Sequence, residues 1–207
     1  AWAHPSGRFI ETDDGTLILP VLAGLSAKDT SGRLDSVGIF RSTDGGVTWG
    51  DFTLIAHDAE HRQIAYNEID IEPMPNGTWV AILRTEWRNH HGGEAASASA
   101  CYSQDQGRNW TKPEFIFIGA VPDLALLPGG GLVCSTSFSK LRFSYDGGQS
   151  WSRELNAHSA SHSHSYPGVE RLDDDHLFVF GRWKGRSGCV YRRVTVAYTH
   201  LRAPETE

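Results

Sequence analysis

The sequence predicts an all-β protein, and three observations support this fold class. Short runs rich in β-branched and aromatic residues recur along the 207 residues, with clusters of Gly, Pro, Asn or Asp between them. No window sustains a helical period of apolar residues with a capping residue at each end. A nine-residue pattern also occurs three times, with its copies 61 and 41 residues apart, a spacing typical of repeated sheets.

The expected strands lie before, between and after the three copies of this pattern. Eight runs are expected to form strands: residues 16–24, 36–42, 79–87, 115–120, 124–128, 131–137, 141–146 and 176–183. A ninth run, GCVYRRVTV at residues 188–196, is also strand-like. Repeated four-stranded units of about 40 to 50 residues are typical of a β-propeller, which is therefore the predicted architecture.

The three copies read RSTDGGVTW, YSQDQGRNW and FSYDGGQSW. We call their shared part, Ser-x-Asp-x-Gly-x-x-Trp at residues 42–49, 103–110 and 144–151, the turn repeats. The Asp lies where a hairpin turns, so its short carboxylate can accept backbone N–H bonds, and the Gly supplies a positive φ without a Cβ penalty. The Trp resumes the strand and buries a large ring between neighbouring hairpins. Because a catalytic site draws different groups from different repeats, three matching copies predict a folding device.

Composition and charge limit the classes of partner. An apolar content of 39% with seven Trp is enough for a real core. The net charge of −6, with acids and bases interspersed, offers no basic stripe for a phosphate backbone, so nucleic acid is not an expected partner. No run of about 18 apolar residues and no signal peptide are visible, so no membrane span is expected. The scattered cysteines Cys101, Cys134 and Cys189 are expected to be buried apolar residues.

The turn repeats resemble the Asp boxes, also called BNR repeats, of the sialidase superfamily, whose members are six-bladed β-propellers. In that family the boxes lie in the outer hairpins, away from the active site. Three boxes and one further strand group account for about three and a half blades, so residues 1–196 are expected to be part of a longer propeller. Residues 197–207 lose all periodicity and resemble a translated sequencing-adapter tail, so we expect them to lie outside the fold.

This resemblance implies a glycoside hydrolase that needs no cofactor or metal and acts on a glycan. Such enzymes usually work outside the cytoplasm, and an exporting segment would precede the residues present. Sialidases use a Tyr nucleophile activated by a Glu, an Asp that acts as acid and base, and three Arg that bind the carboxylate of sialic acid. The Tyr is an exception among glycosidases, most of which use a pair of carboxylates.

Two segments match the sialidase pattern for the nucleophile, its base and one Arg. YNEIDIEPMPNGTWVAILRTE places the Glu at Glu68 and the Arg at Arg84, 16 residues later. SHSYPGVERLDDDHLFVF, after the third turn repeat, places the nucleophile at Tyr166. A Glu beside a Tyr can take the phenol proton as the phenol attacks. Two simpler interpretations stay open: Glu68 pairs with a nearby Arg, and Tyr166 plugs the central channel.

The remaining sialidase parts match this sequence incompletely. The acid/base Asp belongs on the loop before the first turn repeat, where Asp29 is preferred over Asp35 because its position is closer to the family spacing. Where the family has Arg-Ile-Pro, this chain has HPSGRF, and Arg8 is displaced by three residues. Arg142 is the candidate for the third Arg. In the family a Glu supports the first of the three Arg, and here Gly181 occupies its position. The joint loss of this Glu and of that Arg predicts that the carboxylate-binding set of arginines is remodelled.

A histidine-rich stretch raises a competing hypothesis. His158, His162 and His164 precede Tyr166, and residues 90–91 are also histidines. His164 is thus a candidate substrate-binding residue, since a His and a Tyr near an Arg can abstract the proton α to a uronic acid carboxylate and complete a β-elimination. Two His on one strand face can share a metal ion, whereas most Ser/His runs are solvated loops. Three functions stay open: a sialidase-like hydrolase, a lyase or hydrolase of another acidic sugar, and a non-catalytic carbohydrate-binding propeller.

Overall fold

The computed structural model describes most of the chain, in six segments. These are residues 2–24, 35–61, 63–87, 96–157, 164–183 and 189–195. Asp29, the histidines at positions 90, 91, 158 and 162, and the 197–207 tail lie outside the described residues. The chain divides into two compact units, residues 1–120 and 121–207, and each unit is described by itself.

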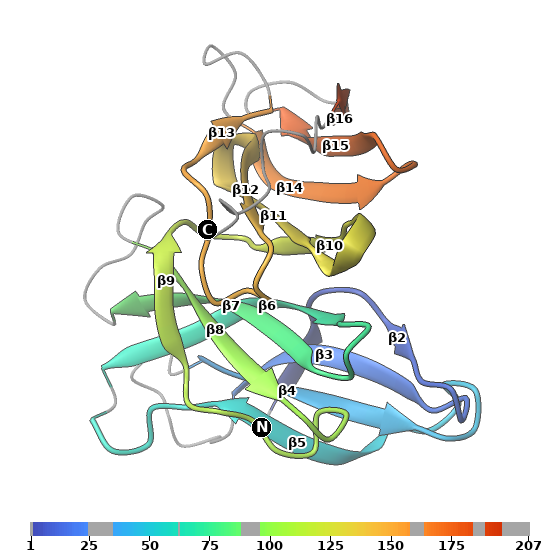
Figure 1. The fold of residues 1–207 in the computed structure, drawn as a ribbon. Coiled ribbons are helices and arrows are strands. Elements are labelled where there is room, and N and C mark those ends of the chain that lie inside the picture. Colours follow the sequence, from blue (N-terminus) through green and yellow to red (C-terminus); the bar gives the residue numbers. More distant parts are fainter. Residues whose placement is uncertain are drawn as a thin grey trace, which may run out of the picture. The chain divides into compact units, whose positions relative to one another are not determined.

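The first unit contains two antiparallel sheets (Figure 1). The strands of the first sheet are, in spatial order, β1 (Trp2–Pro5), β3 (Leu17–Gly24), β4 (Asp35–Ser42) and β5 (Gly50–Ala56), with β2 (Ile10–Glu11) also paired to β3. The strands of the second sheet are β6 (Ile64–Pro73), β7 (Trp79–Trp87), β8 (Ser97–Ser103) and β9 (Glu114–Ile118). In the second sheet every strand pairs with the next one along the chain, as in a propeller blade.

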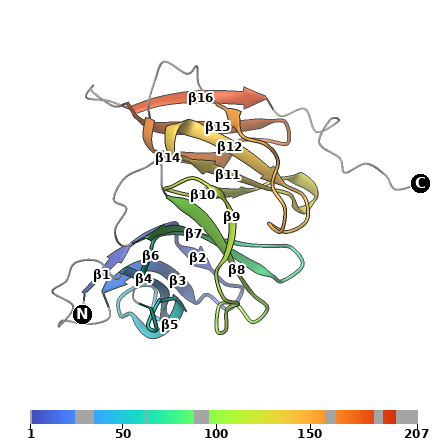
Figure 2. The same ribbon diagram turned by 90° about the vertical axis from the view of Figure 1, so that its left-hand side faces the viewer.

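The second unit also contains two antiparallel sheets, which Figure 2 shows from a second direction. The third sheet consists of β10 (Asp123–Leu126), β11 (Leu132–Thr136), β12 (Lys140–Ser144) and β13 (Leu155–Asn156). Two short 3₁₀ turns, η1 (Pro128–Gly130) and η2 (Ser137–Ser139), connect its strands. The fourth sheet consists of β14 (His164–Arg171), β15 (His176–Trp183) and β16 (Cys189–Thr195).

The predicted all-β fold class is confirmed. Each of the nine runs expected to form strands overlaps a strand, and the six described segments contain no α-helix. Three sheets have a four-stranded path and the fourth has three strands, which agrees with the expected three and a half propeller blades. None of the helical turns in the described part of the chain is long and apolar enough to cross a membrane.

In each unit, a hydrophobic core of described residues lies between the two sheets. The first core consists of Ile10, Ile18, Val37, Ile39, Ile55, Ala56, Ile69, Ile71, Trp79, Ala81, Leu83 and Cys101. The second core consists of Ala125, Leu127, Val133, Leu141, Phe143, Ala157, Val169, Leu177 and Val179. Cys101 and Cys134 are buried thiols, as predicted, and the side chain of Cys189 lies outside the description. Alternating apolar residues on each strand supply these cores because successive side chains point to opposite faces.

Each turn repeat connects the third and fourth strands of a sheet and makes one set of hydrogen bonds. In the first copy, the N–H of Thr48 donates to Asp44 Oδ1 at 2.9 Å and the N–H of Gly46 donates to Ser42 Oγ at 2.9 Å. The half-buried Trp49 donates its indole N–H to the Gly46 carbonyl at 3.0 Å. The second and third copies repeat these bonds at 2.8 to 3.0 Å. Hydrogen bonds from Thr48 and Ser42 lower the pKa of Asp44 to about 2.

The glycines of the turn repeats occupy the left-handed region, as the sequence predicted. Gly46, Gly107 and Gly148 have φ angles of 88°, 77° and 86°. The second turn repeat also contacts the first sheet: a Cβ on Gly107 would lie only 2.8 Å from Cδ1 of Ile39. Nearby, Arg41 Nη2 donates to the Gln106 carbonyl at 3.4 Å. The repeat is therefore a turn of its own sheet and a contact with the preceding one.

Candidate active site

Glu68 lies at a β-bulge in β6, the first strand of the second sheet. Asn67 is paired with Arg84 and Ile69 with Leu83, so Glu68 is one extra residue between two consecutive pairs of the β6–β7 register. Its φ angle is 40°, in the region that non-glycine residues avoid. Bulges often redirect a side chain next to an active site, and such a backbone persists only where its surroundings hold it.

The Glu68 carboxylate forms an ion pair with Arg84. Arg84 Nη1 donates to Glu68 Oε2 at 2.8 Å, and Arg84 Nη2 binds the carboxylate of Glu86. The three side chains are only 20%, 18% and 12% exposed for Glu68, Arg84 and Glu86. Burial alone would lower the pKa of Arg84, but the hydrogen bonds and charges of the two carboxylates outweigh it and raise that pKa. Arg84 therefore stays charged, in a cluster that fits both a catalytic role and the simple Glu–Arg pair.

Tyr166 lies at a second bulge, in β14, the first strand of the fourth sheet. Ser165 is paired with Arg182 and Gly168 with Phe180, so Tyr166 and Pro167 face a single residue, Gly181. Tyr166 has a φ angle of 54° and is 64% exposed. A ring exposed to this extent is accessible to a ligand.

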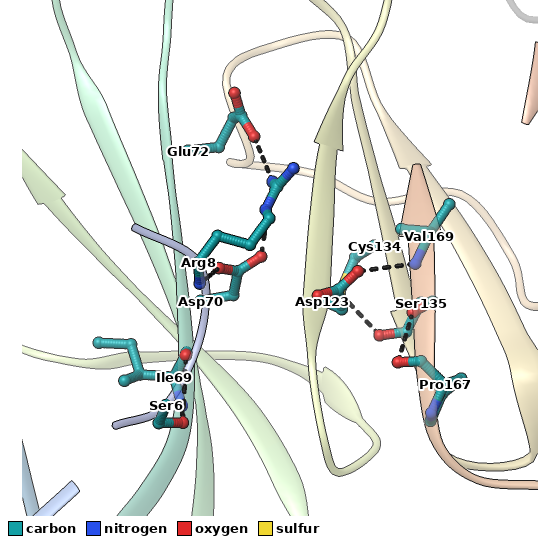
Figure 3. Close-up of polar contacts among 10 residues, drawn as sticks. All are labelled: Ser6, Arg8, Ile69, Asp70, Glu72, Asp123, Cys134, Ser135, Pro167 and Val169. Carbon is teal, nitrogen blue, oxygen red and sulfur yellow. Dashed lines mark hydrogen bonds and ion pairs between the residues drawn. The ribbon is translucent and has the colours of Figure 1, made fainter. Parts of the chain in front are cut away.

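Serine hydroxyls hold the residues that follow Glu68 and Tyr166 in the chain (Figure 3). In the first unit, the Ile69 N–H donates to Ser6 Oγ at 3.0 Å, and the Ser6 hydroxyl donates to the Ile69 carbonyl at 3.3 Å. In the second unit, the Ser135 hydroxyl donates to the Pro167 carbonyl at 3.3 Å. The Val169 N–H, two residues further along, donates to Asp123 Oδ2 at 2.7 Å. Each bulge is thus fixed by side chains of the adjacent sheet in its own unit.

Arg8 binds carboxylates of the second sheet (Figure 3). Its backbone N–H donates to Asp70 Oδ1 at 3.2 Å, and its Nη2 lies 2.7 Å from Glu72 Oε2 and 3.7 Å from Asp70 Oδ2. The Asp70 side chain is fully buried, whereas Arg8 remains 37% exposed. Arg8 therefore connects the first sheet's N-terminal segment to β6.

Arg142 lies on β12, in the strand that leads into the third turn repeat. Its Nη2 donates to Glu154 Oε2 at 2.8 Å, and Lys140 binds the same carboxylate. The hydrogen bond from Lys140, together with Arg142, lowers the pKa of Glu154. This third candidate Arg thus also has a carboxylate partner, from the residue just before β13.

Comparisons with known proteins complete the description of the site. No protein-family model matches the chain. A curated sialidase of Bacteroides fragilis strain YCH46 is 25% identical over 167 residues, which cover 72% of this chain and 27% of that protein. The chain thus spans about a quarter of the length of this curated relative.

Three solved structures share the fold at low sequence identity. The Hadza microbial sialidase Hz136 has a TM-score of 0.71 and 16% identity, covering 93% of this chain and 44% of that chain. A Dyadobacter fermentans protein of unknown function has a TM-score of 0.67 and 22% identity, covering 88% and 50%. The GH93 α-L-arabinofuranosidase of Fusarium graminearum has a TM-score of 0.67 and 17% identity, covering 91% and 62%.

The chain has the fold of the sialidase superfamily. Within this sialidase-like fold, the structure brings Glu68 and Arg84 into contact, which is the pairing that the simpler interpretation of Glu68 expected. Glu86 joins them and was not predicted. Residues two apart on a strand point to the same face, so the position of Glu86 relative to Arg84 was the available signal.

Other predicted site residues of the sialidase-like chain are described only in part. Asp29 lies outside the described residues. Asp35 and His164 lie on β4 and β14, but their side chains are not described. Their roles therefore stay predictions from the sequence.

Proposed function

We propose that this chain is part of a retaining, sialidase-like glycoside hydrolase that acts on an acidic terminal sugar of glycans. Tyr166 attacks the anomeric carbon and gives its phenol proton to Glu68, while the leaving oxygen takes a proton from Asp29. Water then attacks the same carbon and gives a proton to Asp29, and the departing Tyr166 oxygen recovers its proton from Glu68. Arg84 binds the anionic group of the sugar.

The pair of bulges is the observation that carries this proposal. Glu68 and Tyr166 have φ angles of 40° and 54°, and neither is a glycine. Such a backbone costs on the order of 1–3 kcal/mol per residue, and residues of this kind cluster at functional sites. The two residues that the sialidase resemblance selects for catalysis are thus two of the seven described non-glycine residues with a positive φ.

A base next to Tyr166 is a chemical requirement of this mechanism. A free phenol has a pKa of about 10, so at neutral pH it is protonated and a weak nucleophile. A carboxylate that takes its proton during attack removes this limitation. The ion pair with Arg84 supports this role, because it holds the Glu68 carboxylate in one position within the first unit.

The first experiment is an assay of the full-length protein on a fluorogenic sialoside. We expect Tyr166→Phe to lower kcat/KM by about a thousandfold or more, because the nucleophile is lost. Tyr145→Phe is the matched control, since Tyr145 is an exposed tyrosine of the third turn repeat. Acid quenching during turnover, followed by peptide mass measurement, should find the sugar attached to Tyr166. Full activity of Tyr166→Phe would contradict the proposed mechanism.

A second candidate function is hydrolysis or elimination at another sugar. It is favoured by the arginines, because Arg8 and Arg84 each already bind two carboxylates of the chain. One protein with the same fold is an α-L-arabinofuranosidase, so the fold also suits sugars other than sialic acid. Arabinosides and uronic-acid polymers therefore belong in the substrate panel. Unsaturated products would identify a lyase, and glycan binding without turnover would identify a binding propeller.

A further inference from the structure

Arg84 is the residue expected to bind the sugar's anionic group, yet its guanidinium is already engaged on two sides. Nη1 donates to Glu68 Oε2 at 2.8 Å and Nη2 binds the carboxylate of Glu86. Nε is buried and has no hydrogen-bond partner among the described residues. A ligand therefore meets Arg84 only at the two Nη atoms, which the two carboxylates already contact.

The charges of this cluster disfavour an additional anion. Two carboxylates face one guanidinium, so the cluster carries net negative charge when all three groups are ionised. The three side chains are between 12% and 20% exposed, so water and salt screen their interactions less than on an open surface. A sugar carboxylate at Arg84 must therefore displace one of the two glutamates or be repelled by both.

Glu86 is the glutamate better suited to be displaced. Glu68 is fixed at the bulge, whose next residue is held by Ser6. Glu86 instead lies on a regular part of β7, paired in register with Ala65, and its described hydrogen-bond partner is Arg84. Its side chain is not required by the bulge, so its release leaves the Glu68 backbone unchanged.

We propose that Glu86 is a specificity-determining residue, which competes with the carboxylate of an acidic sugar for Arg84. By doing so it lowers the affinity of the site for acidic sugars relative to neutral ones. This inference rests on the proposed function, because it requires that Arg84 faces the bound sugar.

The test measures equilibrium binding to the full-length protein of two matched probes. N-acetylneuraminic acid carries the carboxylate, and its methyl ester is the neutral form. We expect Glu86→Gln to tighten binding of the acid about tenfold and to leave the affinity for the ester within about twofold, because one negative charge beside the anion is removed. The gain should shrink when the salt concentration is raised from about 0.05 M to about 0.5 M.

Two further variants make the result decisive. Glu114→Gln removes a charge from the exposed outer strand β9 of the same sheet and should change neither affinity. Glu86→Thr is a second neutral variant with good β-propensity, to be used if Glu86→Gln does not fold. An unchanged affinity for the acid, or an equal gain for acid and ester, would overturn the proposal.

This binding test is independent of the assay for hydrolysis. If the proposed mechanism is wrong, the Tyr166→Phe variant will remain active, whatever the affinities of the Glu86→Gln variant are. A failure of the Glu86 proposal would appear in the ratio of the two affinities, even in a protein that hydrolyses sialosides through Tyr166. The two outcomes are therefore distinguishable.

Discussion

The bulges at Glu68 and Tyr166 use the same backbone device in different side-chain surroundings. In each, one residue on the first strand of a sheet has a positive φ, and the backbone of the next residue is hydrogen-bonded to a serine hydroxyl from the same unit. Around Glu68 the neighbours are charged, with Arg84 and Glu86 in contact. Tyr166 instead projects a ring that is 64% exposed.

This difference shows that the position of a bulge residue and its chemistry have separate structural causes. The fold decides where a residue leaves the regular strand, and the neighbouring side chains decide its chemistry. A carboxylate base needs a fixed position and a nearby positive charge, whereas a nucleophile needs access to the sugar. In the proposed mechanism, the same type of bulge thus serves two chemical roles without a change of architecture.

The largest expected effect comes from adding a methyl group beside each bulge. A Cβ on Gly7 would lie 2.5 Å from the Ile69 carbonyl oxygen, and Gly7 has a φ of 82°. A Cβ on Gly168 would lie 2.2 Å from Cζ of Phe180, the far end of a ring that is 41% exposed. Because backbone cannot move aside as a ring can, we expect Gly7→Ala to lower the free energy of unfolding by about 3 kcal/mol and Gly168→Ala by about 1 kcal/mol.

Urea denaturation of the purified protein measures both values. Gly15→Ala is the control for backbone strain alone, since Gly15 has a φ of 80° and nothing lies within 4 Å of its added Cβ. It should cost about 1 kcal/mol. A Gly7→Ala variant as stable as Gly15→Ala would mean that the N-terminal segment does not press on the Glu68 bulge.

The next effect concerns the serines that hold the two bulges. Ser135 is fully buried and bonds to Pro167, while Ser6 both accepts from and donates to Ile69. We expect Ser135→Ala and Ser6→Ala each to lower the free energy of unfolding by about 1 kcal/mol, the usual net value of such a bond. Thermal unfolding of both variants checks this, and a cost confined to one of them would show that the two bulges are held by different means.

The smallest effect is a pH dependence of stability that originates at the Asp of the first turn repeat. Asp44 has a folded pKa of about 2, below its ordinary value of 3.8, because of hydrogen bonds from Thr48 and Ser42. The unfolded state therefore binds the proton first, so this stabilisation is complete above about pH 4 and is lost as the pH falls toward 2. Asp44→Asn should flatten the dependence of stability on pH in that window, measured by urea unfolding at several pH values. The exposed Asp13→Asn is the control, and an equal flattening there would contradict this origin.

The sequence predicted the strands well where β-branched and aromatic residues cluster, and less well elsewhere. β8 (Ser97–Ser103) was not expected because its residues are small and its burial comes from the flanking strands of the second sheet. The positive φ angles of Glu68 and Tyr166 have no local signal, since neither residue is a glycine and a register shift depends on the partner strand. Their importance came from the family resemblance alone. Glu86 could have been predicted, because it lies two residues after Arg84 on an expected strand and therefore shares its face.

The contact between the second turn repeat and the first sheet has a consequence for how such a chain grows. Gly107 lies against Ile39, and Arg41 reaches the Gln106 carbonyl. One short loop therefore closes its own hairpin and also packs its sheet against the sheet that precedes it in the chain. A gene segment that encodes such a sheet also encodes the loop that contacts the preceding sheet. Duplication of that segment would therefore add a sheet together with its packing contact.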